Sequence, residues 1–278
     1  MKKIFLLLSL TLFAYTQERI IALSPAINEI IFALGAGEEI VANTDYALYP
    51  KASVELPKVG GYFSPNLEKI VALKPTVVIM QNNNYKLSLK LQRLGIKTKV
   101  IKIDRLKSIK RAIQEIGQLL KREKEAEAIL LEIEDAIKEI KGIVIEKKIL
   151  IVFGSNTDLS RHIFVAGQNL YFDDIINESN NSNALQSKRK GQPILAMENI
   201  IACNPDMVLL LAHNPKSPSD KELIEPWLKL PISASHYKAI YINRESYAGI
   251  PSNRLILFLK DFKTMLQHYK KSIHASHQ

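Results

Sequence analysis

The chain contains two copies of one fourteen-residue pattern, and this repeat limits its possible folds more than any other feature. Residues 67–80 read LEKIVALKPTVVIM and residues 197–210 read MENIIACNPDMVLL, so the copies begin 130 residues apart. In each copy an amphipathic stretch is followed by a proline and an apolar run, which is typical of a helix, a turn and a buried parallel strand. Two copies are too few for a solenoid, which needs about three repeats. We therefore predict two similar α/β lobes.

The same spacing of 130 residues relates a second pair of apolar runs. Residues 20–24 read IIALS and residues 150–154 read LIVFG, and each run ends in a small residue. We interpret each run as the first strand of its lobe. The predicted fold class is α/β, with two similar lobes that each contain a mostly parallel sheet flanked by helices.

A long helical pattern lies between the two predicted lobes. From Ser108 to Lys141 the sequence contains no proline, and its apolar residues recur with a period of about 3.6 residues. The charged segment 121–125 interrupts this pattern. We expect a helix of the first lobe to end there and one long, rigid helix to join the lobes. Such a connector predicts a small hinge motion rather than a wide closure.

The N-terminus has the pattern of a secretory signal. Lys2 and Lys3 precede an apolar stretch over residues 4–13, and residues 14–16 offer small side chains for cleavage. The apolar stretch is shorter than the about 20 residues that span a bilayer, and no cysteine for a lipid anchor lies nearby. We predict a cleaved signal and an exported protein, and the family resemblance described below implies that its destination is the periplasm. The predicted boundaries are a signal peptide over 1–16, an N-terminal lobe over 17–120, a linking helix over 121–145 and a C-terminal lobe over 146–278.

The net charge of +10 at pH 7 raises the question of nucleic-acid binding. The basic residues are spread along the chain, often beside glutamates, and no basic and aromatic recognition motif accompanies them. We interpret them as a solvated surface and expect no nucleic-acid partner. The only cysteine, Cys203, lies within the second repeat helix. It has no partner for an internal disulfide, and we expect it to be buried as a small hydrophobic residue.

Taken together, these segments resemble the periplasmic substrate-binding proteins of ABC importers that carry cobalamin, ferric siderophores or haem. The resemblance covers nearly the whole mature chain, is greatest to the cobalamin-binding members, and is carried by residues 19–29 (RIIALSPAINE), 66–79 (NLEKIVALKPTVVI) and 94–100 (LGIKTKV). It implies a monomeric binding protein without enzymatic activity or a cofactor of its own. Its partners would be a small-molecule metal chelate and an ABC permease dimer in the inner membrane.

The resemblance also implies which residues meet the permease. In this family a glutamate at the tip of each lobe docks onto arginines of the permease, and the matching positions here are Glu68 and Glu198. Both lie in the first turn of a predicted repeat helix. A carboxylate at that place is also stabilised by the helix dipole, without any partner.

The ligand site is expected between the lobes, where loops leave the carboxyl ends of parallel strands. Tyr46 and Tyr62 match positions at which cobalamin-binding members present aromatic rings to the ligand. The other predicted ligand-binding residues lie in loops near the ends of strands: Gln81, Tyr85, Ser246, Tyr247 and Arg254. His213 follows the second repeat strand, but a single loop histidine does not make a metal site. No catalytic residue and no metal site are predicted.

The sequence departs from the cobalamin-binding members in its tryptophan content. The only tryptophan, Trp227, is expected to pack against the second lobe, and Gln81 stands where the resemblance implies a ligand-contacting tryptophan. A siderophore, haem or a nickel-type chelate therefore stays open as the ligand.

Two other classes of function are compatible with a two-lobed α/β protein. One is an enzyme, but Gly35-Ala36-Gly37 lacks the third glycine of a dinucleotide fingerprint, and there is no P-loop or nucleophile elbow. The other is an exported sensor that presents its ligand to a receptor instead of a transporter. The sequence does not separate a sensor from a transport protein.

Overall fold

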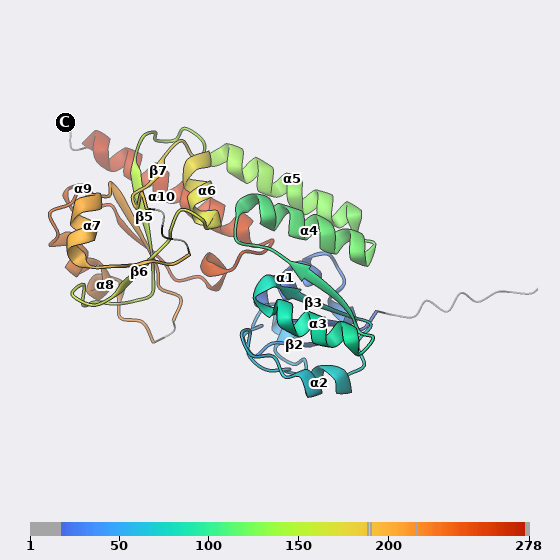
Figure 1. Ribbon diagram of the computed structural model, residues 1–278. Helices are drawn as coiled ribbons and strands as arrows, with labels where there is room; N and C mark the ends of the chain where they lie inside the picture. The colour runs from blue at the N-terminus through green and yellow to red at the C-terminus, as the bar shows by residue number, and fades with distance from the viewer. Residues whose placement is uncertain (1–17, 188, 190, 215, 276–278) are drawn as a thin grey trace, which may run out of the picture.

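The chain folds into two lobes with a layer of helices along one side of both (Figure 1). The computed structural model describes residues 18–187, 189, 191–214 and 216–275. The predicted signal peptide over residues 1–16 lies outside these residues. Each lobe is built around one sheet, as the repeat predicted.

The first lobe contains a four-stranded parallel sheet with the strand order β2-β1-β3-β4. Its strands are β1 (Ile20–Ala22), β2 (Ile40–Asn43), β3 (Val77–Gln81) and β4 (Lys97–Ile101), and its helices are α1 (Pro25–Ala33), α2 (Leu67–Ala72) and α3 (Tyr85–Arg93). Helix α1 begins directly after β1 because Ser24 Oγ accepts a hydrogen bond from the backbone N–H of Ile27 and Pro25 fits the first turn. The carboxyl end of β1 is thereby fixed beside the start of a helix.

The second lobe contains a six-stranded mixed sheet with the order β10-β9-β5-β6-β8, in which β7 also pairs with β5. Its strands are β5 (Lys148–Phe153), β6 (Ile163–Val165), β7 (Ser182–Asn183), β8 (Ile194–Leu195), β9 (Met207–Leu211) and β10 (Ile240–Asn243). Strand β6 pairs antiparallel with β5 and β8, and the other pairs are parallel. The helices are α6 (Tyr171–Glu178), α7 (Met197–Cys203), α8 (Asp220–Leu228), α9 (Ser233–His236) and α10 (Leu255–Ala275). None of the helices in the described ranges is long and apolar enough to cross a membrane.

The two copies of the sequence repeat form the same structure in each lobe. Helix α2 and strand β3 correspond to helix α7 and strand β9. The predicted alignment of the first strands was wrong by one residue. Val77 and Met207 are equivalent positions of the repeat, and they pair with Ile20 and Ile149, so Ile20 corresponds to Ile149 and not to Leu150. Ile20 and Ile149 belong to the same central core cluster. Since successive strand residues point to opposite faces, burial on one face determines this register.

The lobes are connected by a pair of neighbouring helices, α4 (Leu106–Leu120) and α5 (Glu123–Ile140). Lys121 separates them in a left-handed conformation with φ of 56°, at the place where the charged segment interrupts the helical pattern. Helix α5 lies within the predicted linking segment 121–145. Helix α4, which the predicted boundaries assign to the first lobe, contacts α1 and also α6 of the second lobe. The domain boundaries stay a prediction.

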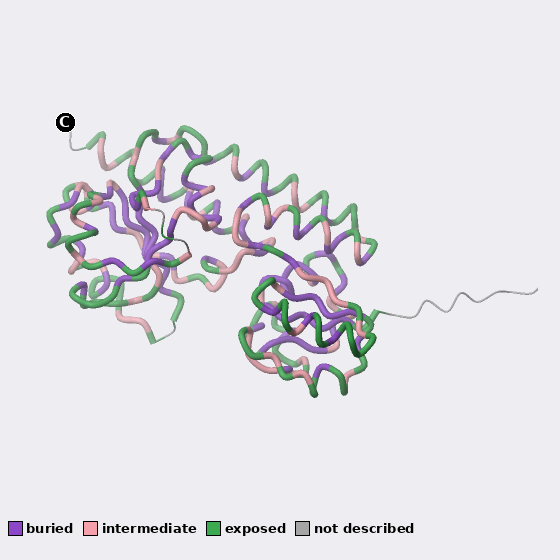
Figure 2. The backbone as a smooth tube through the Cα atoms, viewed as in Figure 1, coloured by how far each residue is buried: buried purple, intermediate pink, exposed green. Residues whose placement is uncertain are grey.

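One hydrophobic core extends through both lobes and the helices between them. It includes strand residues from both sheets and residues from both connecting helices, among them Ile20, Ile79, Ile113, Ile133, Ile151, Leu209 and Phe258. In Figure 2 most of the strands and the inner faces of the helices are buried, whereas the outer faces of the helices and most of β4 are not. The opposite faces of the strands pack into a separate cluster within each lobe. A wide rotation of one lobe would have to disturb the shared core.

Candidate ligand-binding cleft

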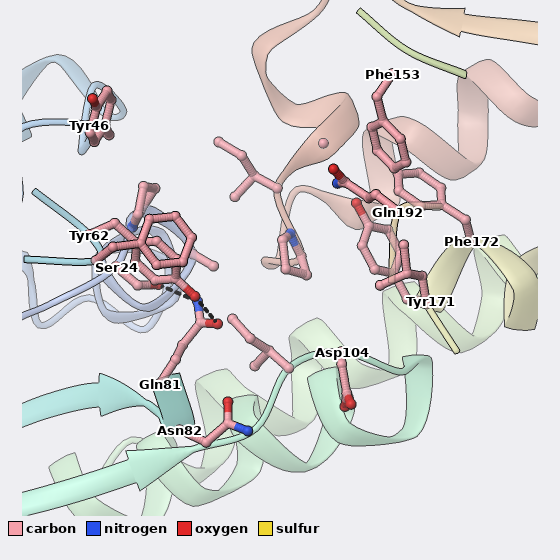
Figure 3. A pocket seen from close by; sticks show the side chains of 18 residues that line it. Ser24, Tyr46, Tyr62, Gln81, Asn82, Asp104, Phe153, Tyr171, Phe172 and Gln192 are labelled. Atoms are coloured by element: carbon pink, nitrogen blue, oxygen red, sulfur yellow. Dashed lines mark hydrogen bonds between the residues drawn. The ribbon is translucent and has the colours of Figure 1, made fainter. Parts of the chain in front are cut away.

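A cavity of about 580 Å³ opens between the lobes, where four strands of the two sheets end. Ser24, Gln81 and Asp104 follow or end strands of the first sheet, and Phe153 ends β5 of the second. The aromatic residues of the lining are Tyr46, Tyr62, Phe63, Phe153, Tyr171 and Phe172, and the amides are Gln81, Asn82 and Gln192. Figure 3 shows one group of labelled residues across this space from another: Tyr46, Tyr62, Ser24, Gln81 and Asn82 of the first lobe lie opposite Phe153, Tyr171, Phe172 and Gln192 of the second.

Tyr62 is held in place by a chain of hydrogen bonds that begins at helix α1 (Figure 3). Its hydroxyl donates to Gln81 Oε1 at 2.7 Å, and Gln81 Nε2 donates to Ser24 Oγ at 2.8 Å. The backbone carbonyl of Tyr62 also accepts a hydrogen bond of 3.0 Å from Asn84 Nδ2. Burial raises the pKa of the Tyr62 hydroxyl, so the ring is neutral at physiological pH. The result is a fixed, neutral aromatic ring at the wall of the cavity.

Two further aromatic rings of the first lobe are exposed to solvent at the cavity. Tyr46 is 66% exposed, and Phe63 is 82% exposed while its ring lies edge-to-face against Tyr62, with ring centroids 4.5 Å apart. The loop that carries Tyr46 is anchored by Lys58, whose Nζ donates to Asn43 Oδ1 at 2.6 Å and to the Ser53 carbonyl at 2.7 Å. A group of exposed rings on an anchored loop is typical of a surface that a ligand covers.

The second lobe supplies the opposite aromatic wall, and sequence reasoning missed it entirely. Tyr171 stacks on Phe172 with ring centroids 4.1 Å apart, and Phe153 packs edge-to-face on Phe172 at 5.6 Å. The Tyr171 hydroxyl donates to the Ala248 carbonyl at 3.4 Å, and burial raises its pKa. Only Phe153 carried a sequence signal, because it ends the first strand of the second repeat.

The predicted ligand-binding residues are divided between the cavity and its surroundings. Tyr46, Tyr62 and Gln81 line the cavity, and in the second lobe the lining consists of other residues than those predicted. Tyr85 begins α3 outside the cavity and is exposed. Ser246, Tyr247 and Arg254 flank the lining segment 249–251 in the sequence but do not line the cavity. Their polar atoms are bonded within the protein: Tyr247 to Asp261, Ser246 to Arg254, and Arg254 to Glu29.

The described lining residues carry little charge. Asp104 is the only acidic residue among them, and they include no lysine, arginine or histidine. The remaining polar groups are amides, hydroxyls and backbone groups. No group of three or more histidine, cysteine, aspartate or glutamate residues in the described part of the chain could hold a metal ion. The arrangement can enclose a large, flat, mostly uncharged molecule and hydrogen-bond to its rim.

Residues 20–227, three quarters of the chain, match the family described as periplasmic binding protein. The chain belongs to this family. The vitamin B12-binding protein of Salmonella paratyphi A is 28% identical to this periplasmic binding protein over 211 residues, which are 74% of this chain and 76% of the relative. The vitamin B12-binding protein of Vibrio vulnificus is 36% identical over 120 residues, and there the match spans only 44% of the relative's length.

Solved structures share the fold of this periplasmic binding protein over almost their full length. The periplasmic vitamin B12-binding protein BtuF of Vibrio cholerae aligns with a TM-score of 0.76 and 21% identity, covering 91% of this chain and 98% of that one. The periplasmic haem-binding protein HutB of the same organism also has a TM-score of 0.76, with 23% identity and coverage of 90% and 99%. At these identities the likeness shows the two-lobed fold alone.

Glu68 and Glu198 occupy equivalent, exposed positions in this periplasmic binding protein. Each lies in the first turn of its repeat helix, α2 or α7, at the outer end of its lobe (Figure 1). Neither carboxylate has an ion-pair partner among the described residues. Both are therefore accessible to another protein.

Three other residues singled out from the sequence lie away from the cavity. Trp227 is buried in the core of the second lobe, as predicted. Cys203 is half-buried against the same core. His213 is exposed, and its Nδ1 lies 3.2 Å from the Arg244 carbonyl.

Proposed function

We propose that this protein captures a metal chelate of low net charge, a cobalamin-like corrinoid, in the inter-lobe cleft and delivers it to an ABC importer. The observation that carries this proposal is the cavity lining, which has aromatic rings on both walls, three amide side chains and no cation among its described residues. A corrinoid is large and flat and carries amide groups around its rim. Amide side chains can both donate to and accept from such a rim.

The lining is less suited to strongly anionic chelates. Haem carries carboxylates, and ferric catecholate complexes are highly anionic. A buried anion needs a paired cation or several hydrogen-bond donors to compensate for its lost hydration. The single acidic lining residue among those described, Asp104, has the wrong sign for this purpose.

The comparisons support the same function without specifying the ligand. The curated relatives include proteins named for vitamin B12 binding, and the structural neighbours include proteins named for haem and siderophore binding. We infer that the chain acts as a monomeric, non-enzymatic binding protein in the periplasm. The predicted cleaved signal over residues 1–16 and the permease-docking role of Glu68 and Glu198 are parts of this proposal.

A ligand panel tests the proposal directly. Cyanocobalamin, haem and a ferric catecholate are added separately to the purified mature protein, and the shift of the unfolding temperature is recorded. A ligand that binds only the folded state raises the free energy of unfolding by about 2.7 kcal/mol at a hundredfold excess over Kd. We expect a clear upward shift with cyanocobalamin. No shift with cyanocobalamin, or a larger one with an anionic chelate, would contradict the ligand assignment.

Replacing Tyr62 by Ala should weaken binding of cyanocobalamin. The variant loses a fixed aromatic ring at the cavity wall, and we expect a loss of about 1–3 kcal/mol in binding free energy. Tyr85→Ala is a matched control, because it removes an exposed tyrosine of the same lobe that lies outside the cavity. Calorimetric titration of both folded variants measures the difference. Equal affinities for the parent and Tyr62→Ala would place the ligand elsewhere.

A further inference from the structure

A buried ion pair joins the two lobes close to the cleft. Glu29 lies on α1 of the first lobe, and Arg254 immediately precedes α10 of the second. The two residues are 225 positions apart in the chain, yet Arg254 Nε donates to Glu29 Oε2 at 3.0 Å and Arg254 Nη2 donates to Glu29 Oε1. Glu29 is 2% exposed and Arg254 is 7% exposed. The contact is therefore bidentate and nearly free of solvent.

Further contacts extend this pair into a bridge between the lobes. Ser252 Oγ donates to Glu29 Oε2 at 2.5 Å, and Arg254 Nη1 donates to Ser246 Oγ at 3.1 Å. The Arg254 guanidinium also lies over the Tyr49 ring of the first lobe, 4.0 Å from its centroid. Arg254 thus contacts the first lobe through a carboxylate and an aromatic face.

The bridge residues lie next in the chain to two segments that line the cavity, one from each lobe. In the first lobe, the lining residues 24–26 open helix α1, and Glu29 follows Ala26 by three positions, about one helical turn. In the second lobe, the lining segment 249–251 immediately precedes Ser252. Glu29, Ser252 and Arg254 do not themselves line the cavity. Their bonds nevertheless connect one wall segment to the other.

We propose that the Glu29–Arg254–Ser252 bridge positions the two walls and so sets the width of the cleft at which the ligand binds. These are positioning residues, because no atom of the bridge reaches the cavity. The expected effect on ligand binding rests on the proposed function, whereas the expected effect on the distance between the lobes does not. The positioning of the lobes is a property of the free protein.

Packing by itself does not explain why a charged pair occupies this place. A buried ion pair loses much hydration, and well-packed apolar residues often replace one without loss of stability. A bidentate guanidinium–carboxylate contact is directional, whereas apolar packing is not. Its two parallel hydrogen bonds restrict both the distance between the two side chains and their rotation relative to each other. Binding sites depend on positioning within about 0.5 Å, which such a contact can provide.

Three variants test the role of the bridge in binding. Glu29→Gln removes the charge. Ser252→Ala removes the hydrogen bond to Glu29 and the one that Ser252 Oγ accepts from the Arg254 backbone N–H, but it leaves no charge unpaired, so it tests the bridge even if Glu29→Gln folds poorly. Glu115→Gln is the control, because it breaks an ion pair with Lys99 and Arg111 that lies outside the cavity. In titrations with cyanocobalamin we expect Ser252→Ala to raise Kd at least about fivefold, since the loss of a single hydrogen bond corresponds to about that factor. Glu29→Gln should raise it further, and Glu115→Gln should leave it unchanged.

A second measurement is independent of the ligand. Spin labels attached through Lys86→Cys on α3 and Lys221→Cys on α8, in a Cys203→Ser background, report the distance between the lobes by electron spin resonance. We expect Glu29→Gln and Ser252→Ala to shift or broaden this distance distribution, and Glu115→Gln to leave it as in the parent.

The outcomes separate the bridge from the proposed function. Failure of the parent to bind cyanocobalamin would contradict the ligand assignment, and the spin-label distances alone would then decide on the bridge. Parent-like distances in both bridge variants would overturn the positioning role. Unchanged Kd values in folded Ser252→Ala and Glu29→Gln, in a parent that binds, would overturn it as well.

Discussion

Replacing both Glu68 and Glu198 by Gln should nearly abolish uptake of the chelate by cells, while the purified protein should bind it as tightly as before. Helices α2 and α7, which carry the two glutamates in their first turns, lie at the outer ends of the lobes, and neither glutamate lines the cavity. If each meets a permease arginine, its removal leaves a desolvated charge without a partner, which costs about 2–5 kcal/mol. The repeat places one glutamate on each lobe, so each single variant should lose part of the uptake.

Uptake of cyanocobalamin by cells that carry each variant measures this effect, with titration of the same purified proteins alongside. Glu123→Gln is the matched control, because Glu123 is also an exposed glutamate in the first turn of a helix but has no counterpart in the repeat. Parent-like uptake by the double variant would leave both glutamates with only a helix-capping role.

Placing Pro at Ile133 should strongly destabilise the protein. Ile133 is fully buried in the middle of α5 and belongs to the core that both lobes share. Proline removes a helix hydrogen bond and clashes with the preceding turn, which costs about 3 kcal/mol or more. Loss of the Ile133 side chain from the core adds to this cost. Urea unfolding followed by circular dichroism measures the change.

Two controls separate the backbone from the side chain. Ile133→Ala keeps the helix and loses only packing, and Glu123→Pro places proline at the first position of α5, where helices tolerate it. Unfolding of Ile133→Pro at the urea concentration of the parent would show that α5 does not support the shared core. The same core predicts little compaction on ligand binding, and a large decrease of the radius of gyration in X-ray scattering would contradict it.

The first-lobe wall of the cavity was the part of the site most accessible to sequence reasoning. Gln81 ends a strand that the repeat identifies, and Tyr62 lies in the loop before the repeat helix. Tyr85 is only four residues beyond Gln81, but a short 3-10 helix over residues 82–84 directs the chain away and Tyr85 begins α3. The short helix that follows β3 therefore decided that Tyr85 lies outside the cavity, although it is close in sequence to the lining residue Gln81.

The second-lobe wall was hidden from the sequence for a different reason. Tyr171 and Phe172 begin α6, and apolar residues at the start of a helix are as typical of ordinary core packing as of a ligand site. Arg254 was predicted to bind the ligand because it follows a loop that the resemblance places at the cleft. In the structure its guanidinium pairs with Glu29 of the other lobe, a contact that no local pattern indicates.

The sequence by itself determined the elements that depend on neighbouring residues. The period of apolar residues and the internal repeat specified two α/β lobes and the helices between them, because each helix and strand pattern acts within a few turns of chain. The tertiary structure alone decided the one-residue register of β5, the core that joins the lobes, and the pairing of Glu29 with Arg254. Each of these requires groups far apart in the chain to meet, and their distance is set only when all elements pack together.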